Sequence, residues 1–306
     1  MLTFLLRRLV LTVPVLFGVA TLVFSLVHLV PGDPAQAMLG ESASAADVAE
    51  LRSRLGLDRP LATQYVEFMK GLARGNVGQS FRYGTPVARE IGARLPRTIE
   101  LAVAAMTVAI LVALPLGVLG AIFKDTFIDQ AAMTVALLGI AMPNFWLGPL
   151  LAIVFSVWLG WLPVSGAGTW LHLVLPAVTL GGALAAMLAR MTRASLAEEL
   201  RELYVVAARA RGISRARAVG RHALRNSLIP VVTIIGLQFG AVLTGTIITE
   251  TIFAWPGVGR LLIQAISFRD YPLVQGCILF IAVIYVGVNL AVDLVYGWLD
   301  PRIRLA

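Results

Sequence analysis

The sequence has few of the residues from which disulfides, metal sites and enzyme active sites are built. Its one cysteine, Cys277, lies in an apolar stretch, which excludes a disulfide framework and a cysteine metal site. Its three histidines are scattered at 28, 172 and 222, and the motifs HExxH and GxSxG are absent. The phosphate-binding motif GxxxxGK[ST] is also absent. We therefore expect no catalytic residue, no metal ion and no bound cofactor on this chain.

Charged and titratable residues are also rare inside the long apolar runs. His28, Glu100, His172, Glu250 and Asp293 all lie near the ends of these runs, where we expect water or lipid headgroups to reach them. A proton-coupled carrier would place carboxylates in the middle of its spans. Their absence there argues against ion coupling, so the energy for any transport must come from elsewhere.

Apolar residues are abundant. They make up 58% of the 306 residues, and the mean hydropathy is +0.85. Roughly 20 apolar residues span a bilayer, and six segments meet that requirement. A turn at 160–168 separates two of them. The predicted spans are 9–31, 98–123, 130–159, 171–190, 227–250 and 273–294. The fold class is therefore an all-α, polytopic membrane protein with about six transmembrane helices.

This pattern predicts four parts. They are an N-terminal transmembrane helix (1–32), an extracytoplasmic helical segment (33–97), a core transmembrane domain (98–298) with a loop at 191–226, and a tail (299–306). The first apolar run is too long for a signal peptide, so we expect it to be retained. Arg and Lys cluster on alternate loops, which by the positive-inside rule places both termini in the cytoplasm. The pI near 10.4 has the same explanation, since no nucleic-acid-binding module is present.

The segment 33–97 carries the periodicity of three short amphipathic helices. The first helix begins at Ser44 with Asp47, the second covers 60–74 and the third covers 86–95. A glycine-rich turn at 74–78 separates the second from the third. Such helices would form a small cap that docks a partner on the outer face. The alternative is that they lie on the lipid surface.

Prolines and glycines interrupt the predicted spans. They indicate kinked helices or a cavity wall, or alternatively ordinary tight packing. Gly236 and Gly240 form a GxxxG pair that would let another helix approach closely. The breakers are Pro115, Pro143, Pro149 and Pro176, with Gly139, Gly148, Gly181 and Gly182. The residues we expect to face a translocation pathway are Asn144, Phe145, Gln238 and Glu250.

The loop between the fourth and fifth spans holds most of the net charge. Residues 190–225 contain nine Arg and three Glu, in a chain whose formal charge is +8. The composition predicts a helix over 196–210, a break at Gly212, and a second helix from Ser214, its N-cap. Arg217, Arg221 and Arg225 would share one face of the second helix. A helix–glycine–helix elbow can transmit force. The alternative is a positive-inside loop whose arginines reach lipid headgroups.

The run from Ala207 to Gly212, AARARG, together with HALRNSLIP at 222–230, resembles the EAA loop of ABC-importer permeases. The likeness is to the dipeptide/oligopeptide/nickel branch, and to the first of its two permease subunits. The stretches ARMTRASL and IPVVTIIGLQFG are most similar to glutathione- and dipeptide-type members. Further matching motifs are PGDP at 31–34, GWLP at 160–163, FAWPGVG at 253–259, RDYP at 269–272 and DPRIR at 300–304.

The resemblance implies a type I ABC importer permease fold in the bacterial cytoplasmic (inner) membrane. It implies a heterodimer with a second homologous permease, two ABC ATPase subunits that bind ATP and Mg, and a periplasmic or lipid-anchored substrate-binding protein. The elbow would couple the permease to an ATPase. Val206 stands where the motif has Glu, and Arg225 where it has its terminal Pro. The coupling residues so implied are Tyr204, Ala207, Ala208, Arg209, Gly212, Arg217, Arg221, His222 and Arg225.

The expected cargo is a small peptide, including glutathione. A nickel or nickel-chelate importer is the alternative, although the spans hold no His or Met cluster that would favour a bare metal. An ion-coupled carrier or a membrane enzyme would work without ATPase partners. A structural scaffold would tolerate changes at Asn144 or Gln238.

Overall fold

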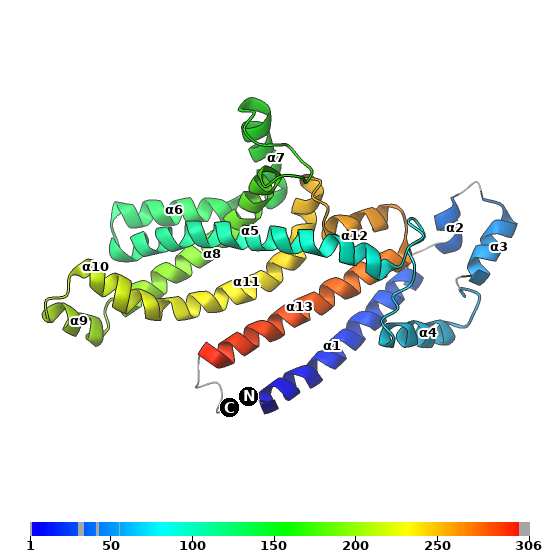
Figure 1. Ribbon diagram of the computed structural model, residues 1–306, viewed down its shortest axis with the longest axis horizontal. Helices are drawn as coiled ribbons and strands as arrows, with labels where there is room; N and C mark the ends of the chain where they lie inside the picture. The colour runs from blue at the N-terminus through cyan, green and yellow to red at the C-terminus, as the bar shows by residue number, and fades with distance from the viewer. Residues whose placement is uncertain (1, 30–33, 41–42, 55, 300–306) are drawn as a thin grey trace. The chain divides into compact units, whose positions relative to one another are not determined.

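The computed structural model describes residues 2–29, 34–40, 43–54 and 56–299, and within these residues it is helical with no strand. Most of the PGDP motif and all of the DPRIR motif lie outside the described residues. So does nearly all of the predicted tail (299–306). Figure 1 shows the order of the helices. They are α1 (Leu2–Leu29), α2 (Pro34–Leu39), α3 (Ala45–Arg54), α4 (Leu61–Ala73), α5 (Val87–Ile122), α6 (Phe127–Ala141), α7 (Asn144–Ala152), the π-helix η1 (Ile153–Trp158), α8 (Leu171–Glu199), α9 (Leu203–Ala210), α10 (Arg215–Arg217), the π-helix η2 (Ala218–Ala223), α11 (Leu224–Ile252), α12 (Val258–Ser267) and α13 (Tyr271–Leu299).

The prediction of about six spans is confirmed. Among the described residues, five helical segments are long and apolar enough to cross a membrane, and a bent pair supplies a sixth. The five are Val10–Leu29, Val87–Ile122, Leu171–Glu199, Arg215–Leu243 and Tyr271–Val292.

The third predicted span is not one straight helix. Between α6 and α7 the chain bends by 100°. Met142 (φ −99°, ψ 116°) and Pro143 (φ −59°, ψ 139°) both leave the helical region there. The proline ring disfavours a helical conformation for the residue before it, which ends α6. Asn144 then starts α7 directly after the break.

Two of the three predicted short helices are confirmed. The Ser44 hydroxyl accepts a hydrogen bond from the Asp47 backbone N–H (3.2 Å) and donates one to its carboxylate (2.7 Å), which starts α3. α4 follows Pro60 and ends in the predicted turn, where Gly75 has φ +72°.

The third predicted helix, 86–95, is wrong as a separate element, because it forms the first turns of α5 and continues through Pro96. The side chains of Val87 and Ile91 are buried. Glu90 also pairs with Arg94 one turn later (2.5 Å). These contacts hold the part of the helix that precedes the proline. α5 therefore begins at Val87, eleven residues before the predicted span at 98–123.

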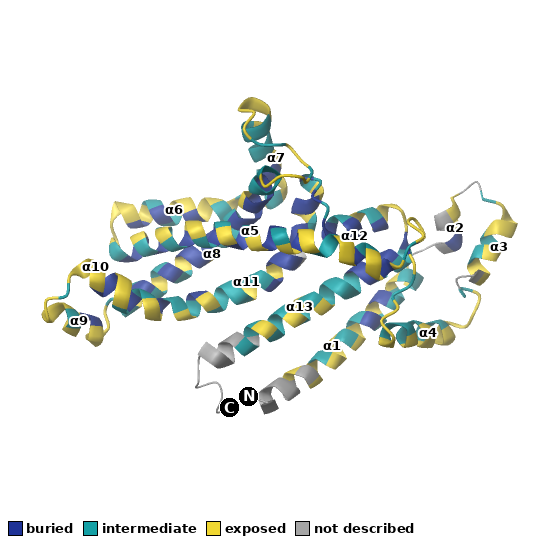
Figure 2. Ribbon diagram, in the orientation of Figure 1, coloured by how far each residue is buried: buried dark blue, intermediate teal, exposed yellow. Residues whose placement is uncertain are grey.

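The described chain divides into two compact units. One comprises Met1–Thr98 and Pro256–Gly287, and the other Ile99–Trp255 and Val288–Ala306. In the second unit, α8 carries many of the buried residues (Figure 2). α6 and part of α5 run beside it (Figure 1).

Glycines set the close packing within the second unit. A methyl group added at Gly139 in α6 would lie 2.2 Å from the Gly182 carbonyl oxygen, and one at Gly181 in α8 would lie 2.5 Å from the Ala105 oxygen. One added at Gly236 would lie 2.9 Å from Val292, so this glycine of the GxxxG pair does face another helix. At these positions the tight-packing interpretation is correct. A methyl group at Gly182 meets nothing within 4 Å.

Candidate functional site: the elbow between α8 and α11

The elbow, defined here as residues 200–226, lies at the end of α8 and the start of α11 (Figure 1). The predicted helix over 196–210 is wrong as one continuous element, although α9 (Leu203–Ala210) confirms its second half. Residues 196–199 belong to α8, the chain turns at 200–202, and Glu202 is extended (φ −63°, ψ 142°) before α9 begins. No proline or glycine marks this turn. Leu196 in α8 and Val205 in α9 are both buried in one apolar cluster, and the chain must turn between them to bury both.

That apolar cluster is the core of the elbow. It joins residues of α5, α8, α9 and η2, so the elbow packs on the ends of two spans rather than projecting as a mobile loop. Its buried members are Ala121, Leu196, Val205, Ala218, Val219 and Ala223. Burial of this kind stabilises by about 25 cal/mol per Å² of apolar surface removed from water.

Gly212 ends α9 in the left-handed conformation (φ +87°). Its N–H donates to the Arg209 carbonyl (3.0 Å), and the Ile213 N–H donates to the Ala208 carbonyl (3.3 Å). These two bonds form a Schellman motif, in which glycine is favoured because it has no Cβ to strain the backbone. Ile213 then packs against the apolar cluster. The predicted break at Gly212 is confirmed.

Beyond Gly212 the chain forms a short irregular connection into α11. Ser214 is the N-cap of α10 by backbone conformation, without a side-chain capping bond. α10 has three residues and runs into the π-helix η2. The sequence gives no sign of this π-helix. Such segments are rare and occur often at functional sites.

Polar contacts tie the elbow to the neighbouring spans. The Arg215 guanidinium donates to the Ile122 carbonyl at the end of α5 (2.9 Å), where a cation is favourable. Beside the elbow, the Ser195 hydroxyl in α8 donates to the Ser227 carbonyl in α11 (3.0 Å), which joins these two helices directly. The Arg215 bond and the apolar cluster fix the elbow itself to α5 and α8.

Tyr204 bridges two parts of the elbow. Its hydroxyl donates to the Glu199 carboxylate at the end of α8 and accepts from the Asn226 side-chain amide (3.1 Å). Partial burial, and then the Glu199 carboxylate, raise the pKa of Tyr204 above its ordinary value. The phenol is therefore protonated at neutral pH and remains a donor.

Most of the predicted coupling residues lie on the surface of the elbow. Ala208 and His222 are half-buried, and the exposed ones are Tyr204, Ala207, Arg209, Gly212, Arg217, Arg221 and Arg225. The structure adds two exposed apolar side chains on α9, Leu203 (82% exposed) and Val206. The elbow thus presents apolar and basic groups together, which suits contact with another protein. Sequence reasoning missed Leu203, although an apolar residue inside a charged loop is a visible signal.

The four predicted pathway residues lie on two helices that pack together. Asn144 and Phe145 begin α7, and Phe145 is 62% exposed. Gln238 lies midway along α11, and its buried side-chain oxygen has no hydrogen-bond partner. A methyl group added at Gly148 in α7 would lie 3.2 Å from Phe253 at the end of α11. Glu250 is fully buried, so the expectation that water reaches it is wrong. It lies near the end of α11, but its neighbours enclose it.

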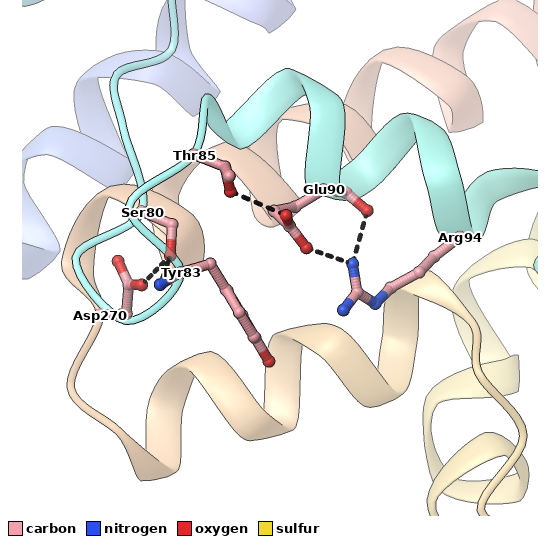
Figure 3. Close-up of polar contacts among 6 residues, drawn as sticks. All are labelled: Ser80, Tyr83, Thr85, Glu90, Arg94 and Asp270. Carbon is pink, nitrogen blue, oxygen red and sulfur yellow. Dashed lines mark hydrogen bonds and ion pairs between the residues drawn. The ribbon is translucent and has the colours of Figure 1, made fainter.

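The other compact unit has a polar network that sequence reasoning missed (Figure 3). Buried Asp270, in the RDYP motif, accepts from the Ser80 hydroxyl (2.5 Å) and the Arg82 N–H (3.1 Å) with one oxygen, and from the Leu273 N–H (3.3 Å) with the other. Nearby, Glu90 accepts from Thr85 (2.7 Å) and Arg94 (2.5 Å). These bonds fix the loop at 79–86 against the start of α13.

Among the described residues, no group of three or more His, Cys, Asp or Glu side chains is placed to hold a metal ion.

The geometry is that of a polytopic helical protein with a fixed, basic elbow between α8 and α11. Residues 113–305 match the family described as "Binding-protein-dependent transport system inner membrane component", and residues 1–102 match its N-terminal family. The chain belongs to this family of transport permeases. Membership implies ATPase and substrate-binding partners.

Relatives match over almost the full length. The chain is 46% identical to the "Di/tripeptide transport system permease protein DppB" of Pseudomonas aeruginosa (strain UCBPP-PA14), over 99% of each protein. It is 44% identical to the "Glutathione transport system permease protein GsiC" of Pectobacterium atrosepticum, over 99% of each.

Solved structures support the fold. The inward-facing MetNI methionine ABC transporter has a chain that matches with a TM-score of 0.57 and 16% identity, over 69% of this chain and 96% of that one. An amino acid ABC transporter with histidines matches with a TM-score of 0.54 and 15% identity, over 69% and 94%. The predicted type I importer permease fold is confirmed.

Proposed function

We propose that this chain is the permease subunit of an ABC importer that moves small peptides, namely di- or oligopeptides or glutathione, across the bacterial inner membrane. The observation that carries the proposal is the 44–46% identity, over 99% of the chain, to permeases named for di/tripeptide and glutathione transport. The nickel alternative is not favoured, because these relatives carry peptide and glutathione names.

In this proposal the chain does no chemistry of its own. Two partner ATPases bind and hydrolyse ATP with Mg, a second homologous permease completes the pathway, and a periplasmic or lipid-anchored binding protein delivers the substrate. Both termini and the elbow face the cytoplasm, in agreement with the excess of arginine in the elbow. The basic and apolar surface of α9 docks on one ATPase. Closure of the ATPases then moves the spans between inward- and outward-facing states.

Asn144, Phe145, Gln238 and Glu250 remain our proposed pathway residues. The support is their position on α7 and α11, which pack together next to the bend at 142–143. The buried side-chain oxygen of Gln238 is an acceptor that receives no hydrogen bond from the described residues.

Uptake in cells tests the proposal. Cells that lack the chain are compared with cells in which it is restored, using labelled di- and tripeptides, glutathione and nickel. Restored peptide or glutathione uptake supports the proposal. Restored uptake of nickel alone contradicts the cargo, and no restored uptake contradicts transport.

Two substitutions at Gly212 test the elbow in the same assay. Gly212→Glu forces a larger side chain into a left-handed conformation, at a cost of about 1–2 kcal/mol, and adds a negative charge to a basic surface. We expect normal membrane insertion, measured by immunoblot, and lost uptake. Gly212→Asn is the matched control, because Asn tolerates this conformation and no atom lies within 4 Å of its Cβ position. Normal uptake by Gly212→Glu would argue against the coupling role.

A further inference from the structure

A charged pair joins α6 to α8 at the end of the unit where the elbow lies. The Arg193 guanidinium donates to both Asp129 oxygens, from Nε to Oδ1 and from Nη2 to Oδ2, each at 2.5 Å. The Asp129 side chain is 5% exposed and that of Arg193 is 28% exposed. A two-bond fork of this kind fixes orientation as well as distance. The Asp125 N–H adds a third bond to Asp129 (2.9 Å), which holds the turn between α5 and α6 to the same carboxylate.

α5 lies directly against this pair. A methyl group added at Gly120 would lie 3.0 Å from the Asp129 oxygen and 3.2 Å from the Arg193 side chain. One turn earlier, a methyl group at Gly117 would lie 2.5 Å from Thr192, next to Arg193 in α8. The backbone of a third helix therefore lies against one side of the pair.

The elbow rests on the same helix ends. Ala121 follows Gly120 in α5, Leu196 lies one turn after Arg193 in α8, and both belong to the apolar cluster of the elbow. Arg215 of the elbow also bonds to the Ile122 carbonyl. A force on the elbow thus reaches α5 and α8 through packing, and at this end of the unit the Asp129–Arg193 pair joins α6 to α8.

α6 is also held at its other end. Gly139 meets the backbone of Gly182 in α8, ten residues or about 15 Å along the helix from Asp129. Directly beyond Gly139 come the bend at 142–143 and Asn144. With both ends of α6 fixed to α8, the two helices have little freedom to slide on each other.

We propose that Asp129 and Arg193 are positioning residues that make α6 move as one body with α8 and the elbow, so that displacement of the elbow reaches the bend before Asn144. This inference rests on the proposed function. The pair touches no substrate. Its role is to keep elbow movement from being lost between α8 and α6.

Two readouts test the pair in the complete transport complex, purified with its ATPases and binding protein and placed in lipid. The first is the amount of peptide transported per ATP hydrolysed. The second is the distance between spin labels at Ala216→Cys in α10 and Leu137→Cys in α6, two exposed positions outside the coupling residues, with and without ATP. Cys277 is buried, so it does not compete for the label.

In the unsubstituted complex we expect the label distance to stay the same with and without ATP. In Asp129→Asn and Arg193→Gln we expect a broadened or shifted distance, and at least about a fivefold loss of transport per ATP. Exchanging the charges, with Asp129→Arg and Arg193→Asp together, should recover part of the ratio. If Asp129→Asn does not accumulate in the membrane, Arg193→Lys is measured in its place. The same change in distance and the same loss of transport per ATP are expected, because Lys keeps the charge but cannot form the two-bond fork.

Matched controls separate the pair from a general loss of charge. Arg190→Gln removes an arginine one turn away on α8, and Asp125→Asn changes the neighbouring acid while its backbone donor remains. Both should keep the transport ratio and the distance. A label distance that changes with ATP in the unsubstituted complex would overturn the proposal, as would unchanged ratio and distance in the Asp129 and Arg193 variants. An unsubstituted complex that transports no peptide would instead overturn the proposed function.

Discussion

Gly139→Ala is expected to destabilise the protein strongly, although it adds a single methyl group. In α6 that methyl group would lie 2.2 Å from the Gly182 carbonyl oxygen and 2.8 Å from its carbonyl carbon. Ordinary contact begins near 3.4 Å, so the two helices must separate locally by about 1.2 Å. The obstructing atoms belong to the backbone, which no side-chain rotation can move. Overpacking usually costs about 1–3 kcal/mol, and a rigid neighbour places this case at the upper end of that range.

Gly182→Ala is the matched control, because it adds the same group to the residue that Gly139 contacts, but in a direction where the methyl group meets no other atom. No atom lies within 4 Å of its Cβ position. Ala is also preferred over Gly inside a helix by about 0.5–1 kcal/mol. We therefore expect Gly182→Ala to be neutral or slightly stabilising.

The assay is thermal denaturation of the purified chain in detergent, followed as the monodisperse fraction remaining after heating at a fixed rate. A fixed rate is needed because unfolding of such proteins is usually irreversible. Gly139→Ala should lose its folded fraction several degrees below the unsubstituted protein, and Gly182→Ala should not. Equal midpoints for the two variants would refute the reasoning that backbone contact at Gly139 joins α6 to α8.

Two further substitutions test the elbow core and the Asp270 network. Leu196→Ala removes a fully buried side chain from the elbow cluster and should cost about 2–5 kcal/mol, measured in the same heating assay. Leu203→Ala, at an 82% exposed position on α9, should change the midpoint little, and equal effects would contradict the elbow core. Both carboxylate oxygens of Asp270 accept hydrogen bonds. Asp270→Asn replaces one of these oxygens with an NH₂ group, which can only donate, and should lower the stability by about 1–3 kcal/mol. It should increase proteolysis at Arg82, whereas unchanged cleavage would mean that Asp270 does not fix this loop.

The sequence predicts the features that depend on local chemistry. Apolar runs locate the spans, because their length is set by the thickness of the bilayer. Gly212 and Gly75 locate helix ends, because the left-handed conformation at these positions favours glycine. Ser44 with Asp47 locates the start of α3. Each of these signals is contained within a few neighbouring residues.

The features that were missed depend on residues far apart in the chain. The turn at 200–202 has no breaker and follows from burial of Leu196 and Val205 in one cluster. α5 extends through Pro96 because Val87 packs at Gly276, where an added methyl group would lie 2.3 Å from it. Asp129 and Arg193 are 64 residues apart. Asp270 and Ser80 are 190 residues apart. Neither pair has a sequence spacing that predicts it.

The glycines and prolines that interrupt the spans have different roles in the structure. Gly117, Gly139 and Gly181 bring α5, α6 and α8 into contact close enough that a methyl group would not fit, which makes these helices a rigid group. Pro143 acts oppositely, since it follows the end of α6 and opens a 100° bend. A rigid group that ends at a bend transfers its displacement to the bend rather than absorbing it. Asn144 and Phe145 follow that bend directly, and for this reason they are the pathway residues whose substitution we expect to affect transport most.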